Sequence, residues 1–532
     1  MRTALAVALL SLVVLAGCSG LSGTGAENAT ATSPASTDTV TPDPATDDTS
    51  TARSSTTATT SADTGEDADG TVTVARADPP TDVLGWEAGY WHNESIAVDN
   101  SDGMNATERR KAVARAMARV EYVRQLEFET NGTIPITVVS RTEHRNRTLN
   151  SSANHSDAFR TFDNTKFEAM FFVGEDTDSL AVQQTNRAST TQGYYDLRND
   201  SIVLISEGGL PQFNGEQTLA QEVGHALQDS RFNVTAIRRS VDSRDALNGQ
   251  NGLIEGDGNL IDERYVARCG DEWECIPKPG TSGSGSGGGS ADVHVGINMM
   301  RYFPYSDGPP FIEYHYDRGG WDAIDAMYAD PPQSAEQVIY PEKYGTDPPT
   351  NVTVEDTNAG GWELVNPPER SPNATLGQSV ITSMFAYTWL ESDYRRRGLG
   401  VVRARDFVNY DDQGRPDADG DLFDYDIAYS SGWEGDTMHV YTNADAAENE
   451  TAYVWRLEWE TESDAREFVD GYGQLLRYWG GEEVDDRDGV YRIDDSRSPF
   501  TDTFAVWRSG TTVTVVNAPE VSDLGDVSDG VE

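Results

Sequence analysis

One stretch of sequence, Glu216 to Asp229, limits most strongly what this chain can fold into. Its letters are EQTLAQEVGHALQD, and its apolar residues recur at the three- and four-residue spacing of a helix. Within it Gln221, Glu222 and His225 form the pattern Q-E-x-x-H. This differs by one letter from H-E-x-x-H, which places two zinc-binding histidines one helical turn apart around a glutamate base. The segment therefore predicts a helix at a candidate metal site.

Gln221 decides whether that site can hold a metal. A glutamine side chain offers a neutral amide oxygen, which binds Zn²⁺ more weakly than imidazole does. Zinc binding is therefore expected to be weak or absent unless another side chain replaces the missing histidine. His294 and His315 are candidates for that replacement, although each is more simply explained as a surface or packed residue.

A second helix is expected to face the first. Residues 252–267 follow an Asn/Gly turn, and in a helix Glu255, Asn259 and Asp262 would share one face. Glu255 follows His225 by 30 residues (255 − 225 = 30), which leaves enough chain for the second helix to return against the first. A glutamate so placed could bind the same metal.

Acidic residues dominate the charge of the chain. Its 532 residues include 89 Asp and Glu against 40 Lys and Arg, which gives a formal net charge of −49. Such a surface stays soluble where salt screens the repulsion between like charges, and it is destabilised where salt is low. Nucleic acid is excluded as a partner, because phosphate recognition needs clustered basic residues. We interpret the chain as the protein of a halophile, and haloarchaea are the expected source.

The N-terminus predicts export and attachment to a membrane. Residues 1–17 contain one arginine and a short apolar run, which is typical of a cleaved signal peptide. The run ends in Leu-Ala-Gly-Cys, which resembles a lipobox and implies that Cys18 carries the lipid; an ordinary signal peptide with an incidental cysteine is the alternative. Residues 18–76 are rich in Thr, Ser and Asp and predict a disordered tether. The chain is thus expected on the extracellular face of the cell membrane, lipid-anchored through Cys18.

Two further features agree with export. Asn-x-Ser/Thr sequences recur along the chain, which favours N-glycosylation of a surface protein. Cys269 and Cys275 lie close together in CGDEWEC, with no further Cys or His at the short spacing of a zinc site. A small disulfide loop is therefore the favoured interpretation of this pair.

The expected helices and strands form two α+β units. The first, residues 77–347, is predicted to place an edge strand beside the Q-E-x-x-H helix. The second and smaller unit, residues 366–527, is predicted to be an antiparallel sheet with helices on one face. The expected helices are 106–127, 156–171, 216–229, 252–267, 377–390 and 463–479, with 311–328 partly helical. The expected strands are 134–140, 201–206, 437–441, 452–459, 503–507 and 511–516.

The second unit contains no catalytic constellation. Its most suggestive stretch, Asp417 to Asp421, faintly resembles a calcium loop. The glycine comes two places too early, and no terminal glutamate follows at the required spacing. The stretch therefore predicts a solvated acidic turn.

Several segments taken together resemble a known family. The resemblance is to haloarchaeal surface lipoproteins with a zincin-like domain, which are related to uncharacterised bacterial HELVHALQDQ proteins. It covers roughly residues 80–345, and GWEGDTMHVY with VWRLEWETESDAREF looks like the C-terminal module that those proteins also carry. The segments are MARVEYVRQLEF, FEAMFFVGED, GYYDL, TLAQEVGHALQD, LIEGD and PPFIEYHYDRGGWDAIDAMYADPPQSAEQVIYPEKY.

This resemblance implies a zincin-like lobe of the gluzincin type, with roles for individual residues. Glu222 would be the general base, and His225 and Glu255 would be zinc ligands. Asn259 would orient a histidine ligand through a hydrogen bond outside the metal's own ligands. The chain departs from the family pattern at Gln221, where the first histidine ligand belongs. It departs again at Tyr340, where a histidine is expected in an L-H-P-E-K-Y-like ending.

Two functions follow as expectations. The lost imidazoles favour a catalytically impaired metallopeptidase domain that serves as a surface binding module for a peptide or a cell-surface glycoprotein. The alternative is an active extracellular zinc metallopeptidase that uses Glu222 as general base. A solute-binding lipoprotein of a transporter is not favoured, because the Q-E-x-x-H pattern has no role there.

Overall fold

The structure is a computed structural model. It describes residues 78–531 with gaps at 130–131, 152–154, 207, 214, 279–292, 392–393, 395–399, 418–420 and 444–449. The expected signal peptide, Cys18 with its expected lipid, and the expected tether to residue 76 lie outside the described residues. Of the helices within the described ranges, none is long and apolar enough to cross a membrane. The fold mixes helices with strands and includes the antiparallel sheet that the sequence predicts.

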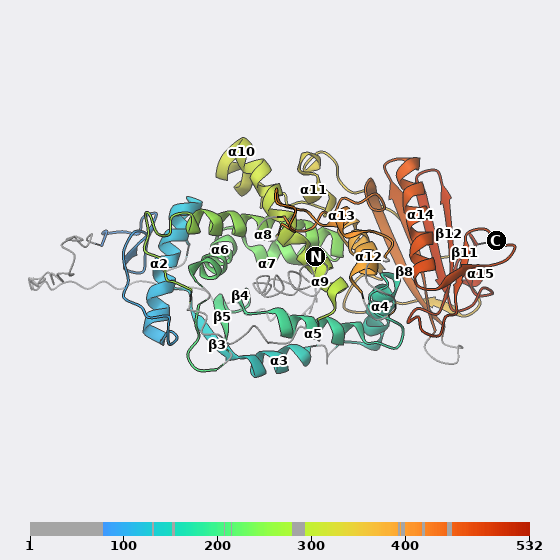
Figure 1. The fold of residues 1–532 in the computed structure, drawn as a ribbon, viewed down its shortest axis with the longest axis horizontal. Coiled ribbons are helices and arrows are strands. Elements are labelled where there is room, and N and C mark those ends of the chain that lie inside the picture. The colour runs from blue at the N-terminus through green and yellow to red at the C-terminus, as the bar shows by residue number, and fades with distance from the viewer. Residues whose placement is uncertain are drawn as a thin grey trace, which may run out of the picture.

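A small sheet lies beside the Q-E-x-x-H helix. Its strand order is β3 (Ile136–Ser140), β5 (Ser201–Ser206), β4 (Gly193–Asp196), with β3 parallel and β4 antiparallel to β5. The helix α6 (Glu216–Phe232) contacts β4, the edge strand, and Figure 1 shows both beside β5. Two polar helices that the sequence does not predict, α3 (Arg141–Leu149) and α5 (Ser179–Thr190), pack together at the margin of this sheet.

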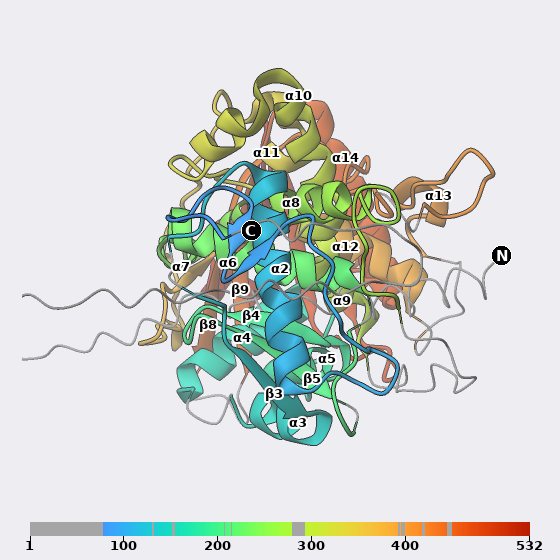
Figure 2. The ribbon, with the colours of Figure 1, turned by 90° about the vertical axis from the view of Figure 1, so that its left-hand side faces the viewer.

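Three long helices hold the site. They are α2 (Ala106–Arg124), α6 and α8 (Arg244–Val266), and each packs against the other two. The start of α6 is fixed by Glu216, whose carboxylate pairs with Arg115 and Arg119 of α2 and accepts a 2.9 Å hydrogen bond from the Tyr265 hydroxyl of α8. A buried acid in the first turn also suits the positive end of the helix dipole. Figure 2 views the molecule from the end at which α2 lies.

α8 is longer than the sequence predicts and lies at the centre of the helical layer. It begins after Ser243, whose hydroxyl accepts a hydrogen bond from the Ala246 amide. It packs against α9 (Val295–Ser306) and α10 (Gly308–Met327) as well as α6. Gly256 makes the close approach to α10 possible, because a Cβ there would lie 2.3 Å from the Gly308 carbonyl oxygen. Shorter helices, α4 (Asp157–Ala169), α7 (Val234–Arg239) and α11 (Glu336–Ile339), complete this half.

Cys269 and Cys275 follow α8 and are joined in a disulfide, with their Cα atoms 5.4 Å apart. Trp273 lies within the loop that this disulfide closes, and its ring packs edge-on against Tyr265. The guanidinium of Arg119 lies 4.7 Å from the centre of the same indole ring. The loop therefore packs on the Glu216 ion pairs at the start of α6.

The C-terminal half is built on an antiparallel sheet. Its strands follow the order β10 (Gly481–Glu483), β11 (Val490–Ile493), β12 (Thr503–Ser509), β13 (Thr512–Ala518), β9 (Thr451–Trp459), β8 (Trp433–Asn443), β6 (Trp362–Leu364), and β7 (Asn373–Ala374) also pairs with β8. Alternate residues of a strand point to opposite faces. Trp455 accordingly joins the core with α14 (Glu462–Tyr478), whereas Val454 packs with α15 (Leu524–Val527). The expectation of helices on one face is therefore wrong, since the short α15 covers part of the second face.

One hydrophobic core runs through both halves. It includes side chains of α4, α8 and α9 together with α12 (Gln378–Leu390), β8, β9 and α14. Phe171, which follows α4, packs its ring 5.0 Å from Phe500 and 6.3 Å from Trp479. The turn-rich stretch at residues 348–365 thus joins two units that share their apolar interior.

Candidate functional site

His225 and Glu255 meet at the contact between α6 and α8. The His225 Nε2 atom lies 3.4 Å from the Glu255 Oε2 atom, and both side chains are buried. Glu222 lies one turn before His225 on the buried side of α6, and its charge acts on the imidazole. The structure therefore brings Glu222, His225 and Glu255 together.

Gln228 fixes the orientation of the His225 ring. Its Oε1 atom lies 2.9 Å from His225 Nδ1, while its Nε2 atom donates to the Ile254 carbonyl at 3.0 Å and to Asp257 at 3.1 Å. Because the amide NH₂ group of Gln228 already donates to two acceptors, its oxygen faces the ring and accepts a hydrogen bond from the Nδ1–H group of His225. The Nε2 atom is then the one directed toward Glu255. Gly258 leaves room for the ring, since a Cβ there would lie 3.1 Å from the imidazole Cε1.

Asp257 anchors Gln228 to three helices. It accepts hydrogen bonds from Arg124 Nε of α2 at 2.9 Å and from the Tyr328 hydroxyl after α10 at 2.7 Å. Arg124 also pairs with Asp325 at 2.6 Å. This network of buried, hydrogen-bonded charges holds Gln228, and through it the imidazole, in one position.

The two facing atoms of the pair lack hydrogen bonds. Within the described part of the chain, neither His225 Nε2 nor Glu255 Oε2 has a hydrogen-bond partner, although both atoms are buried. Burial alone would lower the pKa of His225, but the carboxylates of Glu255 and Glu222 outweigh it and raise that pKa to about 9. The imidazole of His225 can therefore carry a proton on both nitrogens at neutral pH.

The same geometry also fits two ligands of a zinc ion. Two ligand atoms about 2.0–2.1 Å from a tetrahedral Zn²⁺ lie about 3.4 Å from each other. The observed 3.4 Å between His225 Nε2 and Glu255 Oε2 equals this separation of two ligand atoms. The hydrogen bond from Nδ1 to Gln228 is the outer contact that a zinc-binding histidine needs, because it leaves the Nε2 lone pair for the metal.

A third strong ligand is absent from the described residues around this pair. Gln221 is partly exposed, and no hydrogen bond links it to His225 or Glu255 within the described ranges. Both nitrogens of His294 are engaged, Nε2 with the Phe172 carbonyl and Nδ1 with the Ile297 amide. His315 packs between the rings of Phe311 and Tyr344. In the described chain, clusters of three or more metal-binding side chains occur elsewhere and include neither His225 nor Glu255.

The structure also places two further residues of the family pattern. Asn259 makes no hydrogen bond to His225 in the described structure, and Gln228 occupies the orienting role instead. The reason is geometric: Gly258 faces the ring, and Gln228 lies one turn beyond His225 on the same helix. Tyr340, expected in place of a histidine of the site, instead bonds to Gln378 at 3.1 Å and Ser431 at 3.3 Å.

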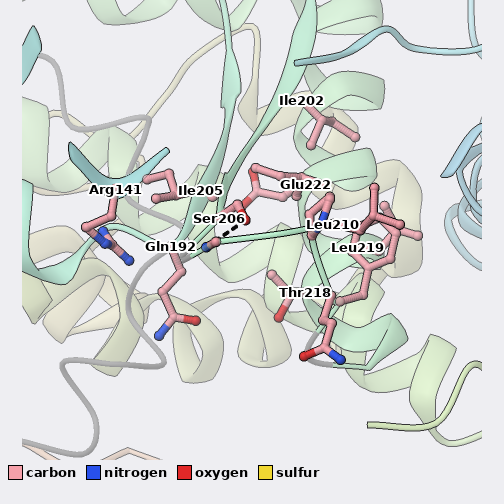
Figure 3. Close-up of a pocket in the computed structure, with 15 residues that line it drawn as sticks. Arg141, Gln192, Ile202, Ile205, Ser206, Leu210, Thr218, Leu219 and Glu222 are labelled. Carbon is pink, nitrogen blue, oxygen red and sulfur yellow. Dashed lines mark hydrogen bonds between the residues drawn. The ribbon is translucent and has the colours of Figure 1, made fainter. Parts of the chain in front are cut away.

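Glu222 also lines a pocket of about 340 Å³ between α6, β5 and the loop after β5. In Figure 3, Arg141 and Gln192 lie on one side of this pocket and Thr218 and Leu219 on the other. The loop is turned by a hydrogen bond from the Gly208 amide to the Ser206 hydroxyl, at 3.2 Å. Leu210 on this loop is 48% exposed at the pocket, which gives it an apolar rim. The volume is that of a small-ligand site.

Sequence reasoning missed Gln228 and the pocket residues. Gln228 lies three residues after His225, and that spacing places the two side chains on one face of a helix. This spacing could have identified it. Arg141 and Gln192 carried no such pattern, because they come from separate segments that only the small sheet brings together.

Comparison with known proteins gives one match. Residues 363–528 match the model of a domain of unknown function, DUF8575. This stretch holds nearly the whole antiparallel sheet and lies outside α6 and α8. No curated protein and no solved structure matches the chain.

Proposed function

We propose that the chain is a lipid-anchored surface protein of a halophile whose zincin-like domain binds a peptide or a surface glycoprotein without hydrolysing it. The observation that carries this proposal is the incomplete ligand set beside an intact pair. The side chains of His225 and Glu255 lie 3.4 Å apart, and Gln228 fixes the imidazole. The position of the third zinc ligand, however, is held by Gln221, whose side chain is a partly exposed amide.

The incomplete set bears directly on catalysis. A catalytic zinc site uses three protein ligands and a water molecule, and the metal would supply the activation of that water. His225 and Glu255 would hold the ion, with Gln221 as a weak third ligand. Without tight binding, Glu222 has no activated water from which to take a proton.

The surroundings of Glu222 favour binding of an extended chain. The pocket of about 340 Å³ offers the Glu222 carboxylate, the Arg141 guanidinium and the apolar Leu210 within one space. The nearby β4 pairs only with β5 within the described sheet. An edge strand of this kind can pair with the backbone of a bound peptide while the pocket takes a side chain.

The test compares metal content with hydrolysis. The full-length protein, purified in molar KCl and dialysed, should contain zinc far below one equivalent by mass spectrometry and should not cleave a mixture of unstructured peptides. Glu222→Gln should change neither result. Stoichiometric zinc together with cleavage that Glu222→Gln abolishes would establish the alternative, an active extracellular zinc metallopeptidase.

Binding needs its own test. Leu210→Glu adds a charge at the exposed rim of the pocket and should weaken capture of peptides from the same mixture. Leu84→Glu is the matched control, because Leu84 is similarly exposed, at 37%, and does not line the pocket. Equal capture by both variants would remove the pocket from the proposal.

Anchorage rests on Cys18, which precedes the described residues. Cys18→Ser removes the thiol to which a lipid would be attached and should release the protein from membranes or leave the precursor uncleaved. Unchanged membrane fractionation of this variant, with the signal peptide removed as in the wild type, would contradict the lipoprotein assignment.

A further inference from the structure

A second pocket, separate from the one beside Glu222, is lined by four aspartates. It has a volume of about 310 Å³ and lies between the start of α10, the end of α11 and the stretch 421–426. Its polar wall consists of Asp307, Asp421, Asp424 and Asp426, and none of its lining residues in the described chain is basic. We call it the aspartate pocket.

Asp307 is the most constrained of the four. It is only 8% exposed, and within the described chain its Oδ2 atom is buried without a hydrogen-bond partner. It precedes α10, yet its side chain makes no capping hydrogen bond to that helix. Burial, and then the charges of the other three aspartates, raise the pKa of Asp307 well above its ordinary value. A buried carboxyl of this kind is stabilised by a cation brought beside it.

The neighbouring carboxylates are held in place around the space. Asp421 accepts a 2.6 Å hydrogen bond from the hydroxyl of Ser306, the last residue of α9, and the same hydroxyl accepts a 3.0 Å hydrogen bond from the Phe423 amide. Asp424 accepts from the Asp426 amide at 2.9 Å. Asp421 therefore belongs to a wall fixed by buried contacts, and residues 418–420 of the predicted solvated turn lie outside the described residues.

The arrangement suits an organic cation better than a chelated metal ion. Carboxylate oxygens that bind one Ca²⁺ at 2.3–2.6 Å lie within about 5 Å of one another. In the described chain, the sets of three side chains whose ligand atoms lie within 4.8 Å include none of these aspartates. The carboxylates surround the space instead of converging on a point, and the volume of 310 Å³ is about ten times the share of one water molecule.

The remaining wall is apolar and aromatic. Phe311 and Tyr340 line the pocket beside the carboxylates. An aromatic face attracts a cation and also covers an alkyl stem. Carboxylates and aromatic rings in one lining are the features that recognise an alkylamine or an alkylguanidinium.

We propose that the aspartate pocket binds an organic cation, an alkylamine or alkylguanidinium the size of a lysine or arginine side chain. The charged end lies by Asp307, Asp421 and Asp424, and the stem lies against Phe311. Such a group can come from a free diamine or from a basic side chain of a peptide, and both share this chemistry. Because the pocket joins α10 to the stretch 421–426, the bound cation also links the two halves of the chain.

Calorimetry on the full-length protein tests this proposal, at the lowest KCl concentration that keeps it folded. Agmatine, butylamine and calcium chloride are the probes, and a peptide with one arginine is compared with the same peptide carrying citrulline. We expect saturable binding of agmatine with one site per chain. The arginine peptide should compete with agmatine if the source is a peptide side chain, and it should not compete if the pocket admits only free amines.

Variants decide whether the aspartates are the site. Asp307→Asn keeps the shape of the side chain but removes the group that can carry a negative charge, and it should weaken agmatine binding by at least about tenfold. Asp317→Asn, an exposed position of α10 with the same change in charge, should leave the affinity unchanged. Asp424→Asn is the second variant if Asp307→Asn does not fold. Equal effects of Asp317→Asn and Asp307→Asn, or binding of calcium in place of agmatine with the same dependence on Asp307, would overturn the proposal.

Discussion

Replacing Gln221 by histidine tests whether the site lacks only one ligand. Gln221→His would place a second imidazole one turn before His225 on a helix that is already formed. The facing pair His225 and Glu255 already has the 3.4 Å separation of two zinc ligands. We expect the variant to bind zinc with one equivalent per chain, whereas the wild type does not.

The size of the gain follows from the number of ligands. Structural zinc sites with four ligands bind with about 10–16 kcal/mol, or about 3–4 kcal/mol for each ligand. One added imidazole should therefore tighten zinc binding by a factor of about 10²–10³. At a free zinc concentration about one hundred times the dissociation constant, the bound metal should add about 2.7 kcal/mol to the free energy of unfolding.

The assay combines metal content after dialysis with thermal melts in zinc and in EDTA, both in molar KCl. Gln413→His is the matched control, since it makes the same change at an exposed position outside α6 and α8. Gln221→His combined with Glu255→Gln should lose the gain. A folded Gln221→His protein that takes up no zinc would refute the placement of His225 and Glu255 as ligands.

Three further predictions concern stability. Asp257→Asn removes one of the two carboxylates that pair with the buried Arg124 and should lower the free energy of unfolding by about 3 kcal/mol, as measured by guanidinium titration. Asp325→Asn, at the more exposed end of the network, should lower it by less. Burial raises the pKa of Glu121 and of Glu87 beside it, so the folded chain keeps protons that the unfolded chain loses above about pH 4.5. The contribution of these two protonated carboxyls to the free energy of unfolding is fully present below that pH and is lost as the pH rises through their raised pKa values. Glu87→Gln should therefore be more stable than the wild type at pH 9 and no more stable at pH 4. Parallel curves of unfolding free energy against pH for the two proteins would contradict this. The net charge of −49 predicts that melting temperatures fall as KCl decreases from molar to about 0.1 M, and melts that do not move with salt would count against a salt-adapted surface.

Periodic apolar residues made much of the fold predictable. The helices α6, α12 and α14 and the β12–β13 hairpin lie close to their expected positions, because each buries a regular apolar face. The polar α3 buries only His144, so its sequence carries no apolar stripe to recognise. α9 includes Pro304 within a run of aromatic residues and was likewise not predicted.

The candidate site was predictable only in part. Motif spacing identifies His225 and Glu222, and it suggests Glu255 on a second helix. The spacing of three residues makes Gln228 a candidate partner for the second nitrogen of His225, but it does not exclude a residue of α8, because that depends on how α6 and α8 rotate against each other. No local sequence pattern could predict the aspartate pocket, because Asp307 and Asp421 are 114 residues apart in the chain (421 − 307 = 114).

The shared core has a consequence for how this chain becomes functional. Phe171 precedes its partners Trp479 and Phe500 by more than 300 residues, so the first half emerges during synthesis with its apolar face uncovered. Only when the strands of the C-terminal sheet arrive can that face be buried. The stretch that matches a separate domain family is therefore not an exchangeable appendage in this chain. It completes the interior on which α8, and with it Glu255, rests.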